Sequence, residues 1–500
     1  MTPGEIFERT FKNSVKMRAA FICPAVVASL FVNLATAADH PPLPSGPQTD
    51  GPFRKTVLDS DQPTNGKWED TVKDPMELAV APDGRVFYAQ RDGTIKMWKP
   101  EAKTTIVIGR IPVFSGLEEG MLGLTLDPDF AKNGWIYLNH SLPETTTDAN
   151  GKKAGIIRVS RYALVGDSLD LDSEKRLLDT AVQREQCCHV GGSLAFDAQG
   201  NLYVSVGDNT NPFESDGYAP IDERPGRSPW DAQKSASNPN DLRGKINRIH
   251  PEPDGTRTIP KGNLFPAGTT GTRPEIYVMG CRNPFRLSID KKTGCLYWGE
   301  VGPDAGGPNP NRGPAGFDEI NQARQAGNFG WPYFIADNKP YVKYDFATKI
   351  FGAPFNPFHP LNRSPNNTGA KDLPTAQPAF LYYPYGPSTK FPVVNAGGGR
   401  TAIAGPVYYF EPNLKSERKL PKEFDHTLFI YEWSRNWIIA VHLDANEQIA
   451  KMERFCDHMT FKRPMDMELG PDGCLYIIEF GSAWGNNLDS QIVRIEYTGH

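Results

Sequence analysis

His189 stands where the residue types of this sequence most favour chemistry. It follows Cys187 and Cys188 and precedes two glycines in the segment CCHVGGSLAFDAQGNLYVSVGD. A histidine on a turn just before a strand can reach into a cleft, and an imidazole can take up a proton near neutral pH. We therefore predict that His189 acts as a general base. The alternative is a histidine that only caps a loop.

The adjacent pair Cys187 and Cys188 has two interpretations, two reduced thiols or a disulfide between sequence neighbours. The chain has seven cysteines, and six remain once the N-terminal segment that contains Cys23 is removed. An even number in an oxidising compartment permits disulfides, but sequence does not choose among the pairings. Cys295 and Cys474 occupy equivalent positions in two repeats, where we expect small apolar core residues.

The first 37 residues predict export. Lys12, Lys16 and Arg18 precede an apolar run from Ala19 to Leu34, and the small residues Ala35 to Ala37 follow it. This is the pattern of a secretory signal peptide. A membrane anchor is the alternative, but the run is short for a spanning helix and no second apolar segment follows. We expect a mature protein without a membrane span, periplasmic or secreted.

The bulk composition indicates one large folded unit. The chain is 39% hydrophobic and 11% aromatic, which is enough to bury a large core. Without residues 1–37, which carry four basic and two acidic side chains, 50 Lys and Arg stand against 57 Asp and Glu, a net charge of −7. This acidic balance gives no reason to expect nucleic acid as a partner. Residues 38–52 are Pro-rich and polar and predict a flexible leader, which leaves 53–500 as the folded domain.

One pattern recurs six times along that domain: an apolar stretch, a turn, and a short run of β-branched or aromatic residues. The turns centre on Gly84, Gly134, Gly200, Gly294, His426 and Gly473. Each copy predicts two antiparallel strands joined by a tight turn. The spacing is uneven, and a propeller tolerates long loops because closure of the ring sets its stability. We predict an all-β, six-bladed β-propeller, with two sandwich domains as the alternative.

Helix is scarce in this pattern. The clearest amphipathic piece is GFDEINQARQAG, residues 316–327, which predicts a short helix that ends at a glycine. The longest segments between repeats, about 209–275 and 303–400, are rich in Gly, Pro and Asn. We expect them to build the rim of a binding face and to hold a loop that selects substrate.

Three tyrosines lie in the second of these segments, in QPAFLYYPYGPS. They are Tyr382, Tyr383 and Tyr385. Aromatic faces stack on sugar rings, so they are candidates for a sugar-binding rim, and packing within a blade is the slightly favoured alternative for each of them.

Several segments in order resemble the glucose/sorbosone dehydrogenase family. Besides the His189 segment they are EEGMLGLTLDPDF, YVMGCRNPFRLSID, GEVGPD, GFDEINQARQAGNFGWP and RPMDMELGPDGCLYI. Each motif is weak alone, and their order over about residues 70–495 is what makes the resemblance specific. It implies a quinoprotein that oxidises an aldose, sorbosone or related polyol with pyrroloquinoline quinone (PQQ) and calcium.

The resemblance also implies roles for single residues. His189 takes the hydroxyl proton of the sugar as a hydride passes to the quinone. Arg282 stabilises the negative charge that develops on the quinone, and Asn283 orients it. Arg435 and Arg463 occupy places where the family holds cations for the three carboxylates of PQQ.

Calcium is implied at a loop whose carbonyl oxygens face the cofactor. Gly302 and Pro303 in GEVGPD match that loop. A hard cation with oxygen ligands polarises a quinone. Asp318 and Glu319 match acidic positions that the family uses around structural calcium, and the alternative is a helix start at which acidic residues are favoured.

Some positions depart from the family pattern. Glu118 replaces a Gln that touches the cofactor, and a carboxylate there repels a tricarboxylate unless it is protonated or bound to metal. Cys188 replaces an Asp, Cys281 follows Gly280, and Arg435 stands in place of a lysine. We hypothesise that Cys187 and Cys188, joined as a disulfide, cover one face of the cofactor.

Electrons must leave through a separate partner, because the sequence has no haem-attachment Cys-x-x-Cys-His. We expect an external acceptor, a cytochrome or a quinone. One alternative function is a calcium-dependent lactonase or lyase, with a metal ringed by carboxylates and amides at the central channel. The other is a noncatalytic carbohydrate- or protein-binding propeller, in which His189, Arg282, Arg435 and Arg463 do not converge.

Overall fold

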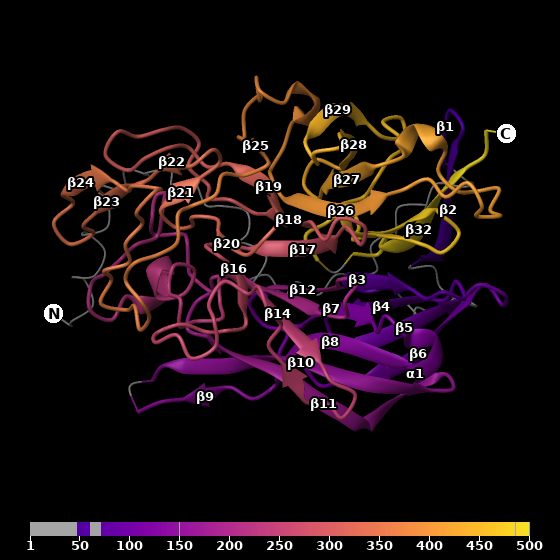
Figure 1. Cartoon of the computed structure of the whole chain (residues 1–500), viewed down its shortest axis with the longest axis horizontal. Coiled ribbons are helices and arrows are strands. Elements are labelled where there is room, and N and C mark those ends of the chain that lie inside the picture. The colour runs from indigo at the N-terminus through magenta and orange to yellow at the C-terminus, as the bar shows by residue number, and fades with distance from the viewer. Residues whose placement is uncertain (1–47, 61–71, 150, 486, 500) are drawn as a thin grey trace, which may run out of the picture. The chain divides into compact units, whose positions relative to one another are not determined.

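Six antiparallel sheets, one for each predicted repeat, form the blades of a β-propeller (Figure 1). The computed structural model describes residues 48–60, 72–149, 151–485 and 487–499. The predicted signal peptide, residues 1–37, lies outside this range. Within the described ranges, no helix is long and apolar enough to cross a membrane.

Each blade has four principal strands, which follow one another from the axis outward. The inner strands are β3 (Pro75–Val80), β7 (Met121–Leu126), β12 (Gly191–Phe196), β17 (Pro284–Ile289), β26 (Ala402–Tyr408) and β30 (Pro464–Leu469). The second strands are β4 (Val86–Gln90), β8 (Trp135–Ser141), β13 (Leu202–Val206), β18 (Leu296–Glu300), β27 (Thr427–Glu432) and β31 (Leu475–Glu479). The third strands are β5 (Thr94–Lys99), β10 (Lys153–Val165), β14 (Lys245–Pro251), β19 (Asp318–Ala323), β28 (Trp437–Leu443) and β32 (Gln491–Tyr497). The fourth strands are β6 (Thr104–Arg110), β11 (Ser168–Gln183), β16 (Ile276–Met279), β25 (Leu381–Tyr383), β29 (Ile449–Arg454) and β2 (Phe53–Ser60).

Short elements extend the blades. The strands β1 (Gln48–Asp50), β9 (Thr146–Thr147), β15 (Arg257–Thr258) and β20 (Gly327–Asn328) pair with β2, β10, β14 and β16. Two small hairpins are β21 (Phe334–Ile335) with β22 (Lys339–Pro340), and β23 (Val342–Tyr344) with β24 (Phe351–Pro354). The helical turns are α1 (Phe130–Asn133), η2 (Ser228–Trp230), η3 (Ala232–Lys234), η4 (Pro392–Val394) and η5 (Lys422–Phe424). Residues 48–50, expected in the flexible leader, therefore belong to a sheet.

The ring is closed by pairing the two ends of the domain. The inner strands pack on one another in chain order, and β30 packs back on β3. The N-terminal strand β2 pairs with the C-terminal strand β32, so that Phe53 lies opposite Tyr497. A closed ring of six blades confirms the predicted fold and excludes two separate sandwich domains.

The predicted turns lie between the inner and second strands of every blade. The five glycines and His426 all have a positive φ, between 55° and 85°. Glycine populates this left-handed region without the steric cost that a Cβ brings, which explains five of the six positions. His426 is the exception.

The pattern indicated two strands in each repeat, because those strands carry the strongest apolar signal. The second strands β4, β13, β18 and β31 are buried along their whole length, because neighbouring blades cover both of their faces. Several of the third and fourth strands lie in the long segments, where the sequence shows no such pattern. The first segment contains β14, and the second contains β19 and β25.

The predicted helix at residues 316–327 is wrong. Residues 318–323 form β19, which pairs with β18 on one side and β25 on the other. Asp318 and Glu319 are buried, and their carboxyl groups accept hydrogen bonds from backbone N–H groups of other loops. These long-range contacts stabilise the strand and override the local helical pattern.

A buried charge cluster lies between three inner strands. Arg286 of β17 donates to the carbonyl oxygen of Met76 at 2.5 Å, and its Nε lies 3.7 Å from Asp466 of β30. Glu77 of β3 accepts from Ser193 Oγ and from Leu124 N. The acidic side chains Glu77 and Asp466 therefore converge near one guanidinium.

Candidate functional site

Four of the predicted site residues lie at the end of the ring where the inner strands begin. Glu118 precedes β7, His189 precedes β12, and Arg282 and Asn283 precede β17. Inner strands of a propeller surround its axis, so the segments that lead into them come close together. The structure thereby connects residues that are far apart in the sequence.

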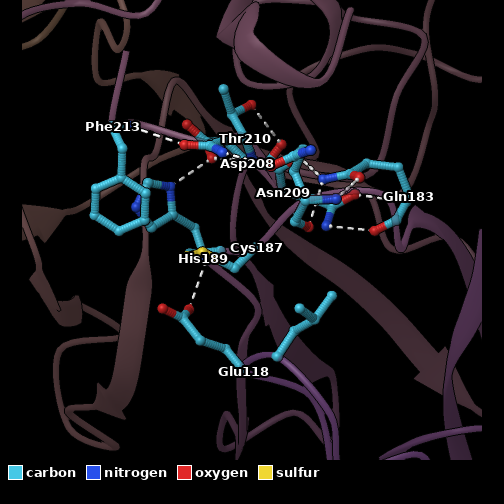
Figure 2. The surroundings of a disulfide bond; sticks show 12 residues. Glu118, Gln183, Cys187, His189, Asp208, Asn209, Thr210 and Phe213 are labelled. Carbon is cyan, nitrogen blue, oxygen red and sulfur yellow. Dashed lines mark hydrogen bonds and ion pairs between the residues drawn. A yellow bond between two sulfur atoms is a disulfide. The ribbon is translucent and has the colours of Figure 1, made fainter. Parts of the chain in front are cut away.

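His189 is held from both sides (Figure 2). Its Nδ1 lies 2.8 Å from Asp208 Oδ1, and its backbone N–H donates to Glu118 Oε2 at 2.6 Å. Because Asp208 is the partner of Nδ1, we place the ring proton on Nδ1, which leaves the lone pair on Nε2. A neutral imidazole held in this way can accept a proton at Nε2.

The backbone of His189 has a φ of 62°, which is uncommon for a residue with a side chain. Its carbonyl oxygen accepts from Asn209 N at 3.1 Å, and its N–H donates to Glu118. The peptide groups before and after the Cα atom of His189 are therefore both fixed. Gly207 makes this close approach possible, because a Cβ there would lie 2.4 Å from the His189 carbonyl carbon. A strained residue fixed by its surroundings is typical of functional sites.

Asp208 is a site residue to which the sequence assigned no role. Its Oδ2 accepts from Trp331 Nε1 at 2.8 Å, and its Oδ1 also accepts from Thr210 N at 3.0 Å. Its backbone N–H donates to the carbonyl oxygen of Arg282 at 2.8 Å. Asp208 therefore links the second strand of one blade to the entry of the next inner strand. The signal in the sequence was the GD that follows β13.

Arg282 and Asn283 are anchored through Glu300. The carboxyl group of Glu300 accepts both of their backbone N–H groups, at 2.8 Å for Arg282. Arg282 Nη1 donates to the carbonyl oxygen of Val301 at 2.8 Å, but its buried Nε has no hydrogen-bond partner in the described chain. Asn283 Oδ1 accepts from Gly191 N at 3.0 Å, so only its amide nitrogen is left to face a ligand.

Arg400 is a second site residue that the sequence missed. It precedes β26 by two residues, as His189 precedes β12 and Arg282 precedes β17. Its guanidinium stacks on the ring of Tyr385, 3.8 Å from the centroid. Its buried Nε and Nη1 have no hydrogen-bond partner among the described residues. No local motif marks it in GGGRTAIAG.

Arg282 and Arg400 offer unpaired donors to an anion. A bound carboxylate accepts hydrogen bonds from guanidinium nitrogens, and orphaned buried donors are costly when nothing fills that role. Asp304 lies between the two arginines, 3.8 Å from Arg282 Nη2, and accepts from the Tyr385 hydroxyl at 2.8 Å. Asp304 is partly exposed, so it offsets the two charges incompletely.

The residues expected to bind calcium are engaged by other groups. Arg400 Nη2 donates to the carbonyl oxygen of Pro303 at 2.7 Å, and Arg400 Nη1 lies 3.6 Å from Asp318 Oδ1. Asp318 also accepts from Gly302 N at 3.0 Å. Glu319 accepts from Ala336 N. A dication at Pro303 would face the Arg400 guanidinium, so the residues as they stand do not fit calcium.

Burial changes the acidity of the carboxyl groups around the two arginines. Desolvation raises the pKa of Glu300 to about 8 and that of Glu319 to about 7. It also raises the pKa of Glu432, which lies beneath the Arg400 loop, to about 8. Protonated carboxyl groups carry no charge, so these residues neutralise the guanidinium charges less than their number suggests.

Arg435 lies in the turn between β27 and β28, and its Nη2 donates to the backbone carbonyl of Tyr385 at 3.3 Å. All three guanidinium nitrogens donate to backbone carbonyls, among them Gly399 at 2.8 Å and Val394 at 3.1 Å. These bonds fix the loop that carries Arg400. Arg435 also lines a surface cavity of about 560 Å³ together with Asn436 and Arg454. No contact joins Arg435 to His189 among the described residues.

Arg463 precedes β30 and so lies at the correct end of the ring. Its guanidinium stacks on two tryptophans, 4.3 Å from the ring centroid of Trp433 and 5.3 Å from that of Trp484. Its Nε donates to the carbonyl oxygen of Ser482 at 3.3 Å. No contact joins it to Arg282 or Arg400 in the described chain.

Cys187 and Cys188 form a disulfide directly before His189 (Figure 2). Of the two interpretations of this pair, the structure contains the disulfide. Cys295 and Cys474 are buried free cysteines before β18 and β31, as expected for core positions.

Of the three tyrosines, two pack within a blade and one lies at the candidate site. Tyr382 and Tyr383 lie in β25 and are buried. Tyr385 is 38% exposed and lies between Arg400 and Asp304 at the candidate site. Only Tyr385 is therefore placed to contact a ligand.

Comparison with known proteins finds a family that is named for sugar dehydrogenases. Residues 72–349 match the family described as Glucose / Sorbosone dehydrogenase. The chain is 25% identical to Aldose sugar dehydrogenase YliI of Escherichia coli over 413 residues, 82% of this chain and 88% of that protein. It is 26% identical to Quinoprotein glucose dehydrogenase B of Acinetobacter calcoaceticus over 278 residues, 55% of this chain and 53% of that protein.

The fold comparison agrees. The PQQ-bound form of Aldose Sugar Dehydrogenase from Streptomyces coelicolor has a TM-score of 0.52 at 18% identity, with 90% of this chain and 99% of that chain covered. At this identity the likeness concerns the fold. The family match covers more than half of the sequence, and this chain therefore belongs to the glucose/sorbosone dehydrogenase family.

Proposed function

We propose that this protein oxidises a sugar, an aldose, sorbosone or related polyol, with PQQ as redox cofactor. The observation that carries the proposal is the His189–Asp208 pair together with Arg282 and Arg400, each of which has a buried guanidinium nitrogen that makes no hydrogen bond in the described chain. A base and an anion-binding group side by side are what such an oxidation requires. The names of the relatives, a quinoprotein glucose dehydrogenase and an aldose sugar dehydrogenase, support the same chemistry.

When bound, PQQ supplies a quinone that accepts a hydride from the C–H bond of the sugar. His189 Nε2 accepts the proton of the hydroxyl group on that carbon, so the sugar loses one hydride and one proton. Asp208 holds the Nδ1 proton and stabilises the imidazolium that forms. Glu118 fixes the backbone of His189 through its N–H.

Arg282 and Arg400 hold the carboxylates and the charge that develops on the bound ring system. Their guanidinium groups come from neighbouring blades, so they approach an anion from two directions. Asn283 offers its amide nitrogen. Arg463 is available as a third cation. We assign to Arg400 the cofactor contact that the sequence suggested for Arg435, whose nitrogens are used by backbone carbonyls.

Calcium at Gly302 and Pro303 requires Arg400 to release the Pro303 carbonyl. We therefore derive no step through calcium. The disulfide of Cys187 and Cys188 is proposed to cover one face of the cofactor, as its position beside His189 suggests. Export to the periplasm or medium, and an external cytochrome or quinone as electron acceptor, belong to the same proposal.

The test is addition of PQQ to the purified protein, followed by dye reduction across a panel of aldoses, ketoses and polyols. The proposal expects reduction that needs both PQQ and a sugar. His189→Ala should abolish turnover and leave PQQ binding, measured by fluorescence, largely intact. Binding of PQQ or sugar without any turnover by the wild type would favour a noncatalytic propeller.

A further inference from the structure

A second cluster of ligating side chains lies at the opposite end of the blades from His189. Asp290 directly follows β17, and Arg282 precedes the same strand, so the length of β17 separates the two clusters. His426 precedes β27, and Glu447 lies between β28 and β29. The cluster therefore joins blade 4, which contains β17, to blade 5, which contains β27 to β29 (Figure 1).

The three side chains converge closely. His426 Nε2 lies 3.1 Å from Glu447 Oε2. One ligand atom from each of Asp290, His426 and Glu447 lies within 4.8 Å of the others. Asp290 and Glu447 are buried, and the His426 side chain is 22% exposed. Partial burial excludes most competing water, whereas an exposed carboxylate cluster is well solvated without an ion.

Surrounding groups orient two of these ligands. Asp290 Oδ2 accepts from the Tyr409 hydroxyl and from Thr293 Oγ1, each at 2.7 Å. The ring of Tyr409 also stacks on the His426 imidazole, with centroids 5.1 Å apart. Tyr409 thus fixes a carboxylate and an imidazole together. Hydrogen bonds and packing that orient ligands in this way are typical of metal sites.

The backbone of His426 gives an independent reason for this side chain. Its φ is 55°, in the turn where the other five blades have glycine. A side chain in the left-handed region costs on the order of 1 kcal/mol, so a histidine here needs a compensating interaction. The contact of its Nε2 with Glu447 is one such interaction.

The ligand set selects the ion. Imidazole nitrogen with two carboxylates suits zinc, whereas calcium and magnesium prefer oxygen ligands alone. In a tetrahedral site with zinc bonds of about 2.0–2.2 Å, neighbouring ligand atoms are roughly 3.4 Å apart. The separation of His426 and Glu447 is close to this value, and the Asp290 ligand atom lies within 4.8 Å of the other two, so it exceeds the tetrahedral spacing by at most about 1.4 Å.

We propose that Asp290, His426 and Glu447 bind one zinc ion that fastens blade 4 to blade 5. Water completes the coordination, because the described chain offers no fourth His, Cys, Asp or Glu within the same distance. The ion binds folded protein alone, so it stabilises the fold by mass action. This site is independent of the sugar oxidation proposed above.

The experiment measures zinc binding to the full chain after treatment with a chelator, by titration calorimetry and by the melting temperature. One zinc ion per chain and a higher melting temperature with zinc are expected. His426→Gly introduces the residue that the other five blades use, so the variant should fold. Its zinc affinity should fall by at least roughly 100-fold, and zinc should no longer raise its melting temperature.

His442→Gln is the matched control. His442 Nε2 lies 2.7 Å from Glu453 in the same blade, a histidine–glutamate pair that belongs to no three-ligand cluster in the described chain. The His442→Gln variant should leave zinc binding unchanged.

Tyr409→Phe keeps the stacking on His426 and loses the hydrogen bond to Asp290, so the affinity of this variant for zinc should fall about tenfold. Equal zinc binding by wild type and His426→Gly, or no binding by the wild type, would overturn the proposal. Neither result involves PQQ or sugar.

Discussion

The carboxylate of Asp208 lies 2.8 Å from Nδ1 of His189, although the two residues flank different strands of one blade. His189 leads into the inner strand β12, and Asp208 leaves the second strand β13. Because these strands pair along their length, the end of one meets the start of the other. Strand pairing therefore brings the base and the group that orients it together.

Asp208→Asn tests this pair. An amide can donate to Nδ1 and so stabilise the wrong tautomer, with the proton on Nε2. Turnover with PQQ should fall by roughly 10²–10⁴-fold, and the affinity for PQQ should change little. Asp197→Asn is the control, because Asp197 binds its own turn in the same blade and does not contact His189. Equal losses in the two variants would point to folding, and no loss in Asp208→Asn would remove its role.

Arg400→Gln and Arg435→Gln separate cofactor binding from loop support. Arg400 has buried nitrogens that make no hydrogen bond in the described chain, so its loss should weaken PQQ binding by about tenfold or more, as measured by fluorescence titration. Arg435 donates only to backbone carbonyls, so its loss should lower the melting temperature first. Tighter PQQ binding by Arg400→Gln than by Arg435→Gln would contradict the assignment.

Calcium should bind poorly to the wild type and better to Arg400→Gln when no quinone is present. The variant frees the carbonyl oxygen of Pro303 and removes the positive charge beside Asp318. Titration calorimetry with calcium chloride measures both proteins. Tight binding of calcium to the wild type that Arg400→Gln leaves unchanged would show that Arg400 does not compete with the ion.

The Glu77→Gln variant should differ from the wild type in how its stability depends on pH. Burial raises the pKa of Glu77 from 4.5 to about 8, and Arg286 and Asp466 are the charged groups that face it. Between these values folded protein keeps a proton that unfolded protein has lost, so stability falls as pH rises, by about 1.4 kcal/mol for each pH unit at most. The stability of the glutamine variant lacks this dependence on pH. Its amide can still form hydrogen bonds with Ser193 Oγ and Leu124 N.

Denaturant unfolding between about pH 5 and 8 measures this difference. The free energy of unfolding of Glu77→Gln relative to wild type should rise steadily with pH. Parallel curves for the two proteins would mean that Glu77 titrates below this range.

The sequence predicted the fold well because the blade turns demand a backbone that glycine provides. Gly84, Gly200 and Gly473 marked hairpins whose apolar strands are buried between blades. Strands such as β19 and β25 carried no such signal. β19 is polar and begins with two acids that accept hydrogen bonds from backbone N–H groups distant in sequence, so a local pattern reads it as a helix.

The candidate site was predictable only where a local motif surrounds the residue. His189 and Arg282 stand in recognisable segments directly before inner strands. Asp208 and Arg400 depend on contacts with residues distant in sequence, such as Trp331 and Pro303. Arg435 illustrates the converse, because it stands in a matching motif but its guanidinium nitrogens are bound by backbone carbonyls that are distant in sequence.

The most direct test of the account compares wild type and His189→Gln, each saturated with PQQ, in single-turnover mixing with a sugar that the wild type oxidises. Glutamine lacks a basic nitrogen, so the rate of the absorbance change that follows sugar addition should fall by at least roughly 10²-fold, with PQQ affinity retained. A rate in His189→Gln equal to that of the wild type would show that the proton leaves the sugar by another route.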